Sequence, residues 1–134
     1  MPAHVIPQCV MLIDDDPDDN FLHRLVIQDT GLSPEILVAE SGEKALNYFK
    51  DNHAGAFRRP DIIFLDINMP GMSGFDFLEK YKALPAEVHA QTKVVMLSTS
   101  SLPKDQQKAS SIWEHVYYHT KPLTEKILYE VIGA

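Results

Sequence analysis

Five side chains that suit metal and phosphoryl chemistry stand at or near the ends of apolar runs. Asp14 and Asp15 directly follow CVMLI, Asp66 follows DIIFL, and Ser98 follows KVVML. Lys121 comes soon after the weaker run HVYYH. Carboxylates bind hard divalent cations, and an ammonium or hydroxyl group can hold phosphoryl oxygens. The chemistry open to these groups therefore depends on whether the fold brings them together.

If they converge, the three carboxylates raise one another's pKa, and a bound Mg²⁺ removes that conflict. Mg²⁺ prefers octahedral oxygen ligands and keeps several waters, so one or two aspartates and a backbone carbonyl suffice. One carboxylate can then still attack a phosphoryl group and become an aspartyl phosphate. Lys121 and Ser98 would hold the phosphoryl oxygens, because this transfer needs mainly positioning and neutralisation of charge.

Apolar runs rich in β-branched residues must position these groups as strands. They cover residues 9–13, 35–39, 61–65 and 93–97, with a weaker fifth run at 115–119. Because the first four lack polar alternation, we expect them to be covered on both faces, as in a parallel sheet. The segments between the runs carry helical spacing, least clearly from Pro103 to Ser111. In the first of these segments the spacing predicts a buried face made of Phe21, Leu22, Leu25 and Val26.

Strand and helix alternate five times along the chain. Right-handed crossovers then build a parallel sheet with helices on both faces. We expect an α/β fold, a flavodoxin-like doubly wound five-stranded parallel sheet of order 2-1-3-4-5 with five helices. Ligands of such sheets bind outside the carboxyl ends of the strands, which is where the side chains named above would meet.

Composition narrows the class of protein. The 134 residues carry 12 Lys+Arg against 19 Asp+Glu, a formal net charge of -7, which disfavours binding to nucleic acid. The N-terminus lacks the pattern of a secretory signal, and no apolar run approaches the roughly 20 residues of a membrane span. A lone Cys9 excludes an internal disulfide. We therefore expect a cytoplasmic protein without membrane insertion.

The acidic run DDDPDD, residues 14–19, divides at its proline. Pro17 suits the first position of a helix, which makes Asp16 the expected N-cap. Asp18 and Asp19 then lie in the first turn, where the helix dipole favours each negative charge by roughly 0.3–1 kcal/mol. We interpret the first two aspartates of the run as functional and the other three as mainly structural.

The motifs MLIDDDP, DIIFLDINMPGMSG, VVMLSTS and HTKPL together resemble the receiver domain of two-component response regulators. The resemblance covers residues 8–133 and leaves residues 1–7 as an N-terminal extension. It implies that Asp66 is the phosphoacceptor and that Asp15 binds Mg²⁺ directly, whereas Asp14 does so mostly through water. Asn68 would lend its backbone carbonyl to the metal.

The same resemblance implies roles for residues of the last two strands and the loops after them. Ser98 falls where the family has its switch residue, Lys121 where it has an invariant lysine, and Tyr118 where an aromatic ring reorients on activation. The Lys121–Pro122 peptide matches one that is typically cis. Thr99 takes a position often held by Ala or Gly, where the backbone amide contacts the phosphoryl group, so its larger side chain would narrow access to Asp66.

The implied function is a single-domain response regulator and not an enzyme. A histidine kinase or histidine phosphotransfer protein would load it, and a downstream protein target would read it. The chain ends at VIGA soon after the last expected helix, so we expect no attached output domain.

Two other classes of protein share parts of this pattern. A Mg²⁺-dependent phosphohydrolase that uses an aspartyl phosphate needs a second Asp two residues after the nucleophile, where this chain has Asn68. A flavin-binding electron carrier needs a Ser/Thr/Gly-rich phosphate loop after the first strand, where this chain has DDDPDD.

Overall fold

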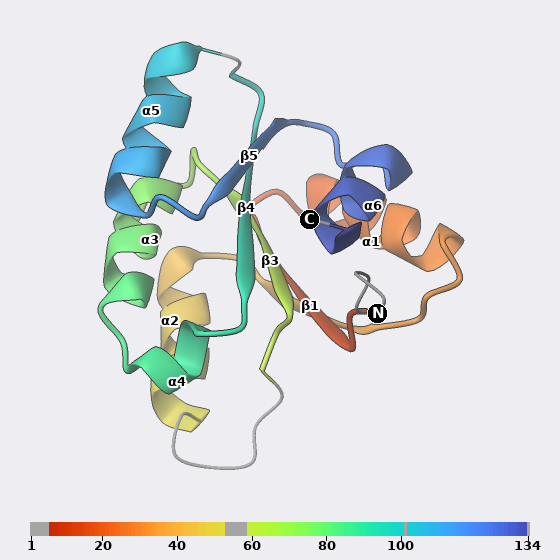
Figure 1. Ribbon diagram of the computed structural model, residues 1–134, viewed down its shortest axis with the longest axis horizontal. Helices are drawn as coiled ribbons and strands as arrows, with labels where there is room; N and C mark the ends of the chain where they lie inside the picture. The colour runs from red at the N-terminus through yellow and green to blue at the C-terminus, as the bar shows by residue number, and fades with distance from the viewer. Residues whose placement is uncertain (1–5, 53–58, 101, 134) are drawn as a thin grey trace.

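A five-stranded parallel sheet forms the centre of the protein, and helices cover both of its faces (Figure 1). The computed structural model describes residues 6–52, 59–100 and 102–133, so residues 1–5 of the expected N-terminal extension lie outside it. The strands are β1 (Cys9–Ile13), β2 (Glu35–Ala39), β3 (Ile62–Asp66), β4 (Lys93–Ser98) and β5 (Tyr117–Thr120). The helices are α1 (Pro17–Asp29), α2 (Gly42–Asn52), α3 (Gly74–Lys82), α4 (Ala86–His89), α5 (Pro103–Ile112) and α6 (Glu125–Gly133).

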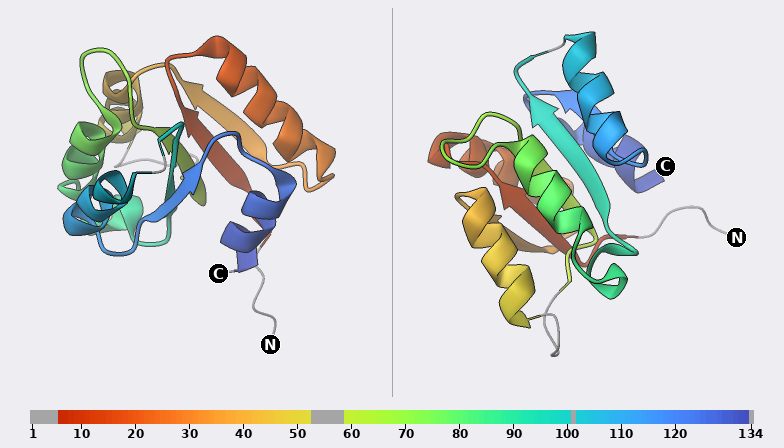
Figure 2. Two further views of the ribbon diagram at one scale, coloured as in Figure 1. Left: turned by 90° about the horizontal axis from the view of Figure 1, so that it is seen from above. Right: turned by 90° about the vertical axis from the view of Figure 1, so that its left-hand side faces the viewer.

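The strand order is β2-β1-β3-β4-β5, and all four pairings are parallel, which confirms the predicted topology. Helices α1 and α6 lie on one face of the sheet, and the other four lie on the opposite face (Figures 1 and 2). Alternate residues of each strand serve the two cores, so that Leu12 and Phe64 pack toward α1 and α6 while Met11 and Ile63 pack toward α2 and α3. All residues of β1 and β3 are buried, as their continuous apolar runs predicted.

Strand β2 departs from the prediction that it is covered on both faces. It lies at the edge of the sheet, where Glu35 and Val38 are exposed, and only Ala39 is buried. A continuous apolar run does not distinguish a central strand from an edge strand, because the run reports local composition and not the number of neighbours.

Helix α1 faces the core mostly with different side chains from those predicted. Asn20, His23 and Ile27 are buried, whereas Phe21, Leu22 and Leu25 are respectively 60%, 53% and 38% exposed. Polar contacts at the start of the helix, described below, set its rotation about its own axis. Of the four predicted side chains, Val26 does pack against the core, so apolar spacing identified the helix correctly and its buried face only in part.

The described residues form six helices, one more than the five predicted. The segment before β4 contains the four-residue helix α4, in which Val88 is buried. The ring of His89 lies 5.2 Å from that of Trp113 and 5.7 Å from that of Tyr81, centroid to centroid. This extra turn thus ties the ends of α3 and α5 together at the amino edge of the sheet. Across the described residues, none of the helices has the length and apolar character that crossing a bilayer requires.

Candidate phosphoacceptor and metal site

The predicted site residues do meet at the carboxyl edge of the sheet. Asp14 follows β1 directly, while Asp66 and Ser98 end β3 and β4. Lys121 follows β5, and its backbone N–H donates to the Ser98 carbonyl at 2.8 Å. One carboxylate oxygen from each of Asp14, Asp15 and Asp66 lies within 4.8 Å of the others. Parallel strands bring residues more than 50 positions apart into one small acidic group.

Lys121 holds the centre of this group. Its Nζ lies 2.8 Å from Asp14 Oδ2, 2.7 Å from Asp19 Oδ2 and 3.0 Å from Asp66 Oδ1. Burial on its own lowers the pKa of Lys121, but hydrogen bonds to Asp14, Asp19 and Asp66 outweigh it, and the net result is a raised pKa. The ammonium group is therefore charged throughout the physiological range.

Asp19 has a contact that the division of the acidic run did not predict. It lies in the first turn of α1, as expected, and its carboxylate also makes the shortest of the three contacts with Lys121. Asp16 and Pro17 do have the predicted roles, because Asp16 Oδ1 accepts from Asp18 N–H at 2.9 Å and Pro17 is the first residue of α1.

The environment of Asp66 disfavours its charged form. Burial raises the pKa of this carboxyl group, the nearby Asp14 carboxylate raises it further, and the hydrogen bond from Lys121 opposes both effects. A divalent cation at the Asp14, Asp15 and Asp66 oxygens would favour the carboxylate form. The donor set consists of carboxylate oxygens alone, which fits a hard ion such as Mg²⁺.

Local hydrogen bonds fix the position of Asp14. Its Oδ1 accepts from the Asp16 N–H at 2.9 Å, and its carbonyl accepts from Asn20 Nδ2 at 2.9 Å. Its own N–H donates to the Ala39 carbonyl at 3.1 Å, which links it to β2. The Asp14 carboxylate is therefore held rigidly toward Lys121 and Asp66.

Two other predicted residues lie on the loops that follow β3 and β4. Asn68 and Thr99 are both exposed, two residues beyond Asp66 and one beyond Ser98. The Asn68 side chain is an amide, which cannot act as the second acid that a phosphohydrolase of this kind needs. The Lys121–Pro122 peptide is cis, as the motif HTKPL implied.

Hydrogen bonds connect Ser98 to β5 and α5 through a residue that sequence reasoning missed. Ser100 N–H donates to Ser98 Oγ at 3.0 Å, and the Ser100 carbonyl accepts from the Tyr118 hydroxyl at 3.0 Å. Ser100 Oγ also donates to Asp105 Oδ2, in the first turn of α5, at 2.8 Å. The Tyr118 ring is therefore turned inward, and Ser100 joins three elements.

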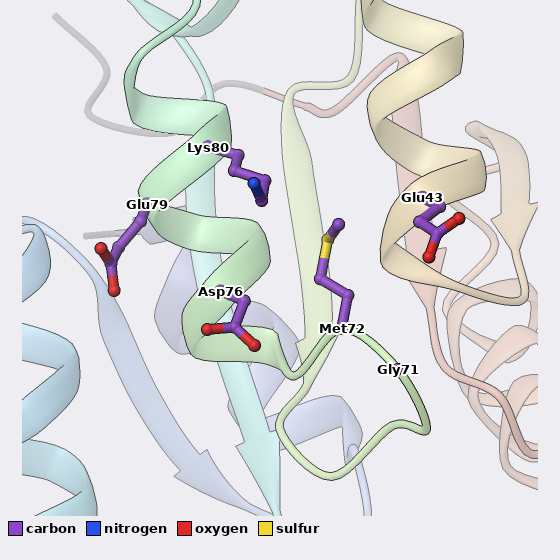
Figure 3. Close-up of a pocket in the computed structure, with 6 residues that line it drawn as sticks. All are labelled: Glu43, Gly71, Met72, Asp76, Glu79 and Lys80. Carbon is purple, nitrogen blue, oxygen red and sulfur yellow. The ribbon is translucent and has the colours of Figure 1, made fainter.

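A hollow lies beside the loop after β3, between α2 and α3 (Figure 3). Glu43, Asp76 and Glu79 make it acidic, with Met72 and Lys80 as its other side chains. Asp76 is engaged locally, since it forms a capping box with Ser73 at the start of α3. This hollow is separate from the group around Lys121.

The sequence profile of the response regulator receiver domain matches residues 10–133. The chain belongs to this family. A crystal structure of a two-component response regulator from Cytophaga hutchinsonii is similar to it, with 37% identity, a TM-score of 0.83 and coverage of 92% of each chain. The phosphorylated cyanobacterial phytochrome response regulator RcpA shares 27% identity with this receiver domain at a TM-score of 0.73, covering 94% of this chain and 89% of that one.

Among curated proteins, the autoinducer 1 sensor kinase/phosphatase LuxN of Vibrio campbellii is 30% identical over 124 residues. That match takes in 92% of this receiver domain but only 13% of the kinase. The chain thus spans a small part of the length of such relatives, and the similarity concerns their receiver domains.

Proposed function

We propose that this receiver domain accepts a phosphoryl group on Asp66 from a histidine kinase or histidine phosphotransfer protein, in a Mg²⁺-dependent reaction. The observation that carries the proposal is the contact of 3.0 Å between Asp66 Oδ1 and Lys121 Nζ at the end of the central strand β3. A carboxylate so placed can act as a nucleophile while the ammonium group neutralises phosphoryl oxygens.

In the transfer, an Asp66 oxygen forms a bond to phosphorus as the P–N bond to the donor imidazole breaks. The imidazole nitrogen keeps the electron pair of that bond and is then protonated by solvent. Asp14, Asp15, Asp66 and the Asn68 backbone carbonyl would hold Mg²⁺, which would supply further neutralisation of the phosphoryl oxygens. The Thr99 backbone N–H would contact the same oxygens, and the exposed Thr99 side chain would narrow the approach to Asp66.

The outward face of α1 supports docking of the phosphodonor protein. Phe21, Leu22 and Leu25 are exposed on this helix, and Phe21 lines a shallow hollow together with Pro17 and the exposed Val38 of β2. Pro17 begins α1 only three residues after Asp14, so the apolar surface starts beside the site. A cluster of large exposed apolar side chains is typical of protein interaction surfaces.

The face formed by α5, β5 and α6 supports readout by a downstream protein. Ser98 would turn toward a phosphoryl oxygen, and Ser100 would follow because its N–H is bound to Ser98 Oγ. Ser100 also holds Tyr118 and Asp105, so the movement reaches β5 and α5. Charge at the site thereby changes the shape of a surface that a partner can bind.

Labelling with a small-molecule donor tests the proposal. Phosphoramidate and Mg²⁺ should place one acid-labile phosphoryl group on the parent protein, detected by mass spectrometry, and none on Asp66→Ala. Omission of Mg²⁺ should abolish labelling as well. Label that persists at full level on Asp66→Ala contradicts the assignment of the phosphoacceptor. The stand-alone, single-domain arrangement stays a prediction from the sequence.

A further inference from the structure

Asp19 contacts Lys121 but lies outside the group of carboxylates that can share a metal ion. Its Oδ2 is 2.7 Å from Lys121 Nζ. Within the described residues, the carboxylates placed to bind one ion together are those of Asp14, Asp15 and Asp66. Asp14 and Asp66 therefore serve both the metal cluster and Lys121, whereas Asp19 contacts Lys121 from outside that cluster.

Three carboxylates surround the ammonium group of Lys121. Nζ donates hydrogen bonds to Asp14 at 2.8 Å and to Asp19 at 2.7 Å, and Asp66 Oδ1 forms an ion pair with it at 3.0 Å. A phosphoryl group attached to Asp66 therefore meets an ammonium group that two other carboxylates already hold. Phosphorylation turns an oxygen of Asp66 into the bridging oxygen of an acyl phosphate, and a metal ion draws on Asp14, so the bond to Asp19 is the one that neither event requires to break.

We infer that Asp19 is a positioning residue that tethers Lys121 beside Asp66 both before and after phosphorylation. The inference rests on the proposed function of Asp66. Lys121 has a flexible four-carbon stem, and immobilising such a side chain costs conformational entropy. Because Asp19 fixes the ammonium group in the free protein, most of that ordering has taken place before the phosphoryl group arrives.

The charge of Asp19 and its tethering of Lys121 predict opposite effects on the affinity for a phosphoryl analogue. The direction in which that affinity changes when Asp19 is replaced therefore tests the inference. Four carboxylates (Asp14, Asp15, Asp19 and Asp66) and one ammonium group give the site a formal charge of -4 + 1 = -3. As a bare negative charge, Asp19 would repel an incoming phosphoryl group, so that its removal would tighten binding of a phosphoryl analogue. As a tether, its removal weakens that binding.

The first arm of the experiment examines the free protein. Lysine ammonium groups held in ion pairs exchange their protons slowly enough to give ¹H–¹⁵N NMR signals, and the Lys121 signal is assigned by its loss in Lys121→Met. In Asp19→Asn this signal should vanish or exchange much faster, whereas in the matched control Asp18→Asn it should persist. Asp18 is the preceding residue of the same helix turn, and its side chain is exposed.

The second arm titrates beryllofluoride, a phosphoryl analogue, in the presence of Mg²⁺ by ¹⁹F NMR. The dissociation constant should rise about tenfold in Asp19→Asn, the scale of the side-chain entropy that a free lysine loses on ordering, and by less than about twofold in Asp18→Asn. Asp19→Glu, which keeps the charge, should lie closer to the parent than Asp19→Asn does.

An unchanged or tighter beryllofluoride affinity in Asp19→Asn, or an undisturbed Lys121 signal, overturns the tether. If the parent protein itself fails to bind beryllofluoride, the proposed function of Asp66 fails. The Lys121 signal of the free protein then still decides whether Asp19 holds the ammonium group, so the two failures are distinguishable.

Discussion

Replacement of Gly74 by Ala should displace the backbone of the phosphoacceptor Asp66. Gly74 is the first residue of α3, and its N–H donates to the Ile67 carbonyl at 2.8 Å. A Cβ atom at this position would press on the Asp66 carbonyl oxygen and would lie 2.9 Å from Ile67 Cα and 3.1 Å from the Asp66 carbonyl carbon. All three atoms belong to the backbone, so no side-chain rotation can relieve the overlap.

The expected loss of folding stability follows from the fixed position of these backbone atoms. Overpacking typically destabilises a protein by about 1–3 kcal/mol, and unrelieved backbone contacts place Gly74→Ala at roughly 2–3 kcal/mol. For 134 residues the entropy of unfolding is about 0.28 kcal/mol/K, so the melting temperature should fall by roughly 7–11 °C. The displaced Asp66 backbone should also weaken beryllofluoride binding at temperatures where the variant is fully folded.

Gly42 provides a matched control because it is the first residue of α2. A Cβ atom there would lie 2.7 Å from Met72 Sδ, the end of a flexible side chain seen between α2 and α3 in Figure 3. Met72 can rotate away, so Gly42→Ala should change the melting temperature by less than about 3 °C and leave beryllofluoride affinity unaltered. Calorimetry and ¹⁹F titration of both variants measure these effects. Equal melting temperatures for the two would refute the argument from backbone contact.

Four further outcomes are expected. By calorimetry, Asp15→Ala should weaken Mg²⁺ binding roughly tenfold or more and Asp18→Ala little, because only the first removes a carboxylate of the metal cluster; equal losses would mean an undivided acidic patch. Burial lowers the pKa of His23, with the nearby Lys121 charge acting in the same direction, so the unfolded chain binds more protons below the ordinary value of 6.5. Stability should therefore be complete above about pH 6.5 and decline on acidification by at most ~1.4 kcal/mol per pH unit from this group; denaturant titrations of His23→Leu should lack this component, and an identical pH profile would contradict it. Ser98→Ala should still accept the phosphoryl group on Asp66, but the resulting conformational change should reach β5 and α5 poorly. The NMR shifts that beryllofluoride induces in residues 103–121 should then be reduced; shifts as large as in the parent would exclude Ser98 as the switch. Phe21→Ala should slow transfer from a phosphorylated histidine phosphotransfer domain several-fold, the effect of losing an interface aromatic, without changing labelling by phosphoramidate; a parallel loss with both donors would place the defect in the site and not in docking.

Strand positions could be predicted because each central strand carries its own signal, whereas the strand order was taken from the arrangement that is common in doubly wound sheets of this size. The runs CVMLI and KVVML lie within β1 and β4, and their lack of alternation reflects helices on both faces. The convergence of Asp14, Asp66 and Lys121 followed from topology alone, since parallel strands place all their carboxyl ends on one edge. Which sequence-distant residues lie at the same edge of the sheet depends on the fold class and not on individual side-chain contacts.

Contacts made by single side chains were beyond the same reasoning. The bond from Asp19 to Lys121 spans 102 positions, and no local pattern distinguishes Asp19 from Asp18 beside it. Ser100 was missed for a similar reason, because its hydrogen bonds with Ser98, Asp105 and Tyr118 join elements that only the folded chain brings together. Short polar side chains are common in the loops of any protein, so the sequence did not indicate which of them would form contacts between elements.

The helix α4 could not be predicted from the sequence for a different reason, which is its length. Pro85 precedes its first residue, and a four-residue helix is too short to display helical periodicity. Its partner Trp113 follows α5 and lies at the amino edge of the sheet, opposite the carboxylate group. This tryptophan is therefore placed to report movements at the end of α5 and is poorly placed to report Mg²⁺ directly.

Helix α1 explains why apolar pattern and burial disagree in one element. Its first turn must bring Asp19 to Lys121 and Asn20 to the Asp14 carbonyl, and these bonds of 2.7 and 2.9 Å fix the rotation of the helix. Residues three or four positions apart share a helix face, so His23 and then Ile27 follow Asn20 into the core. Phe21 lies about 100° around the axis from Asn20 and is consequently turned outward. A helix selected for burial alone would rotate to cover Phe21, at the expense of both polar bonds. The site thus determines the orientation of α1, and it leaves in solvent the apolar side chains that we propose as the docking surface of the phosphodonor protein.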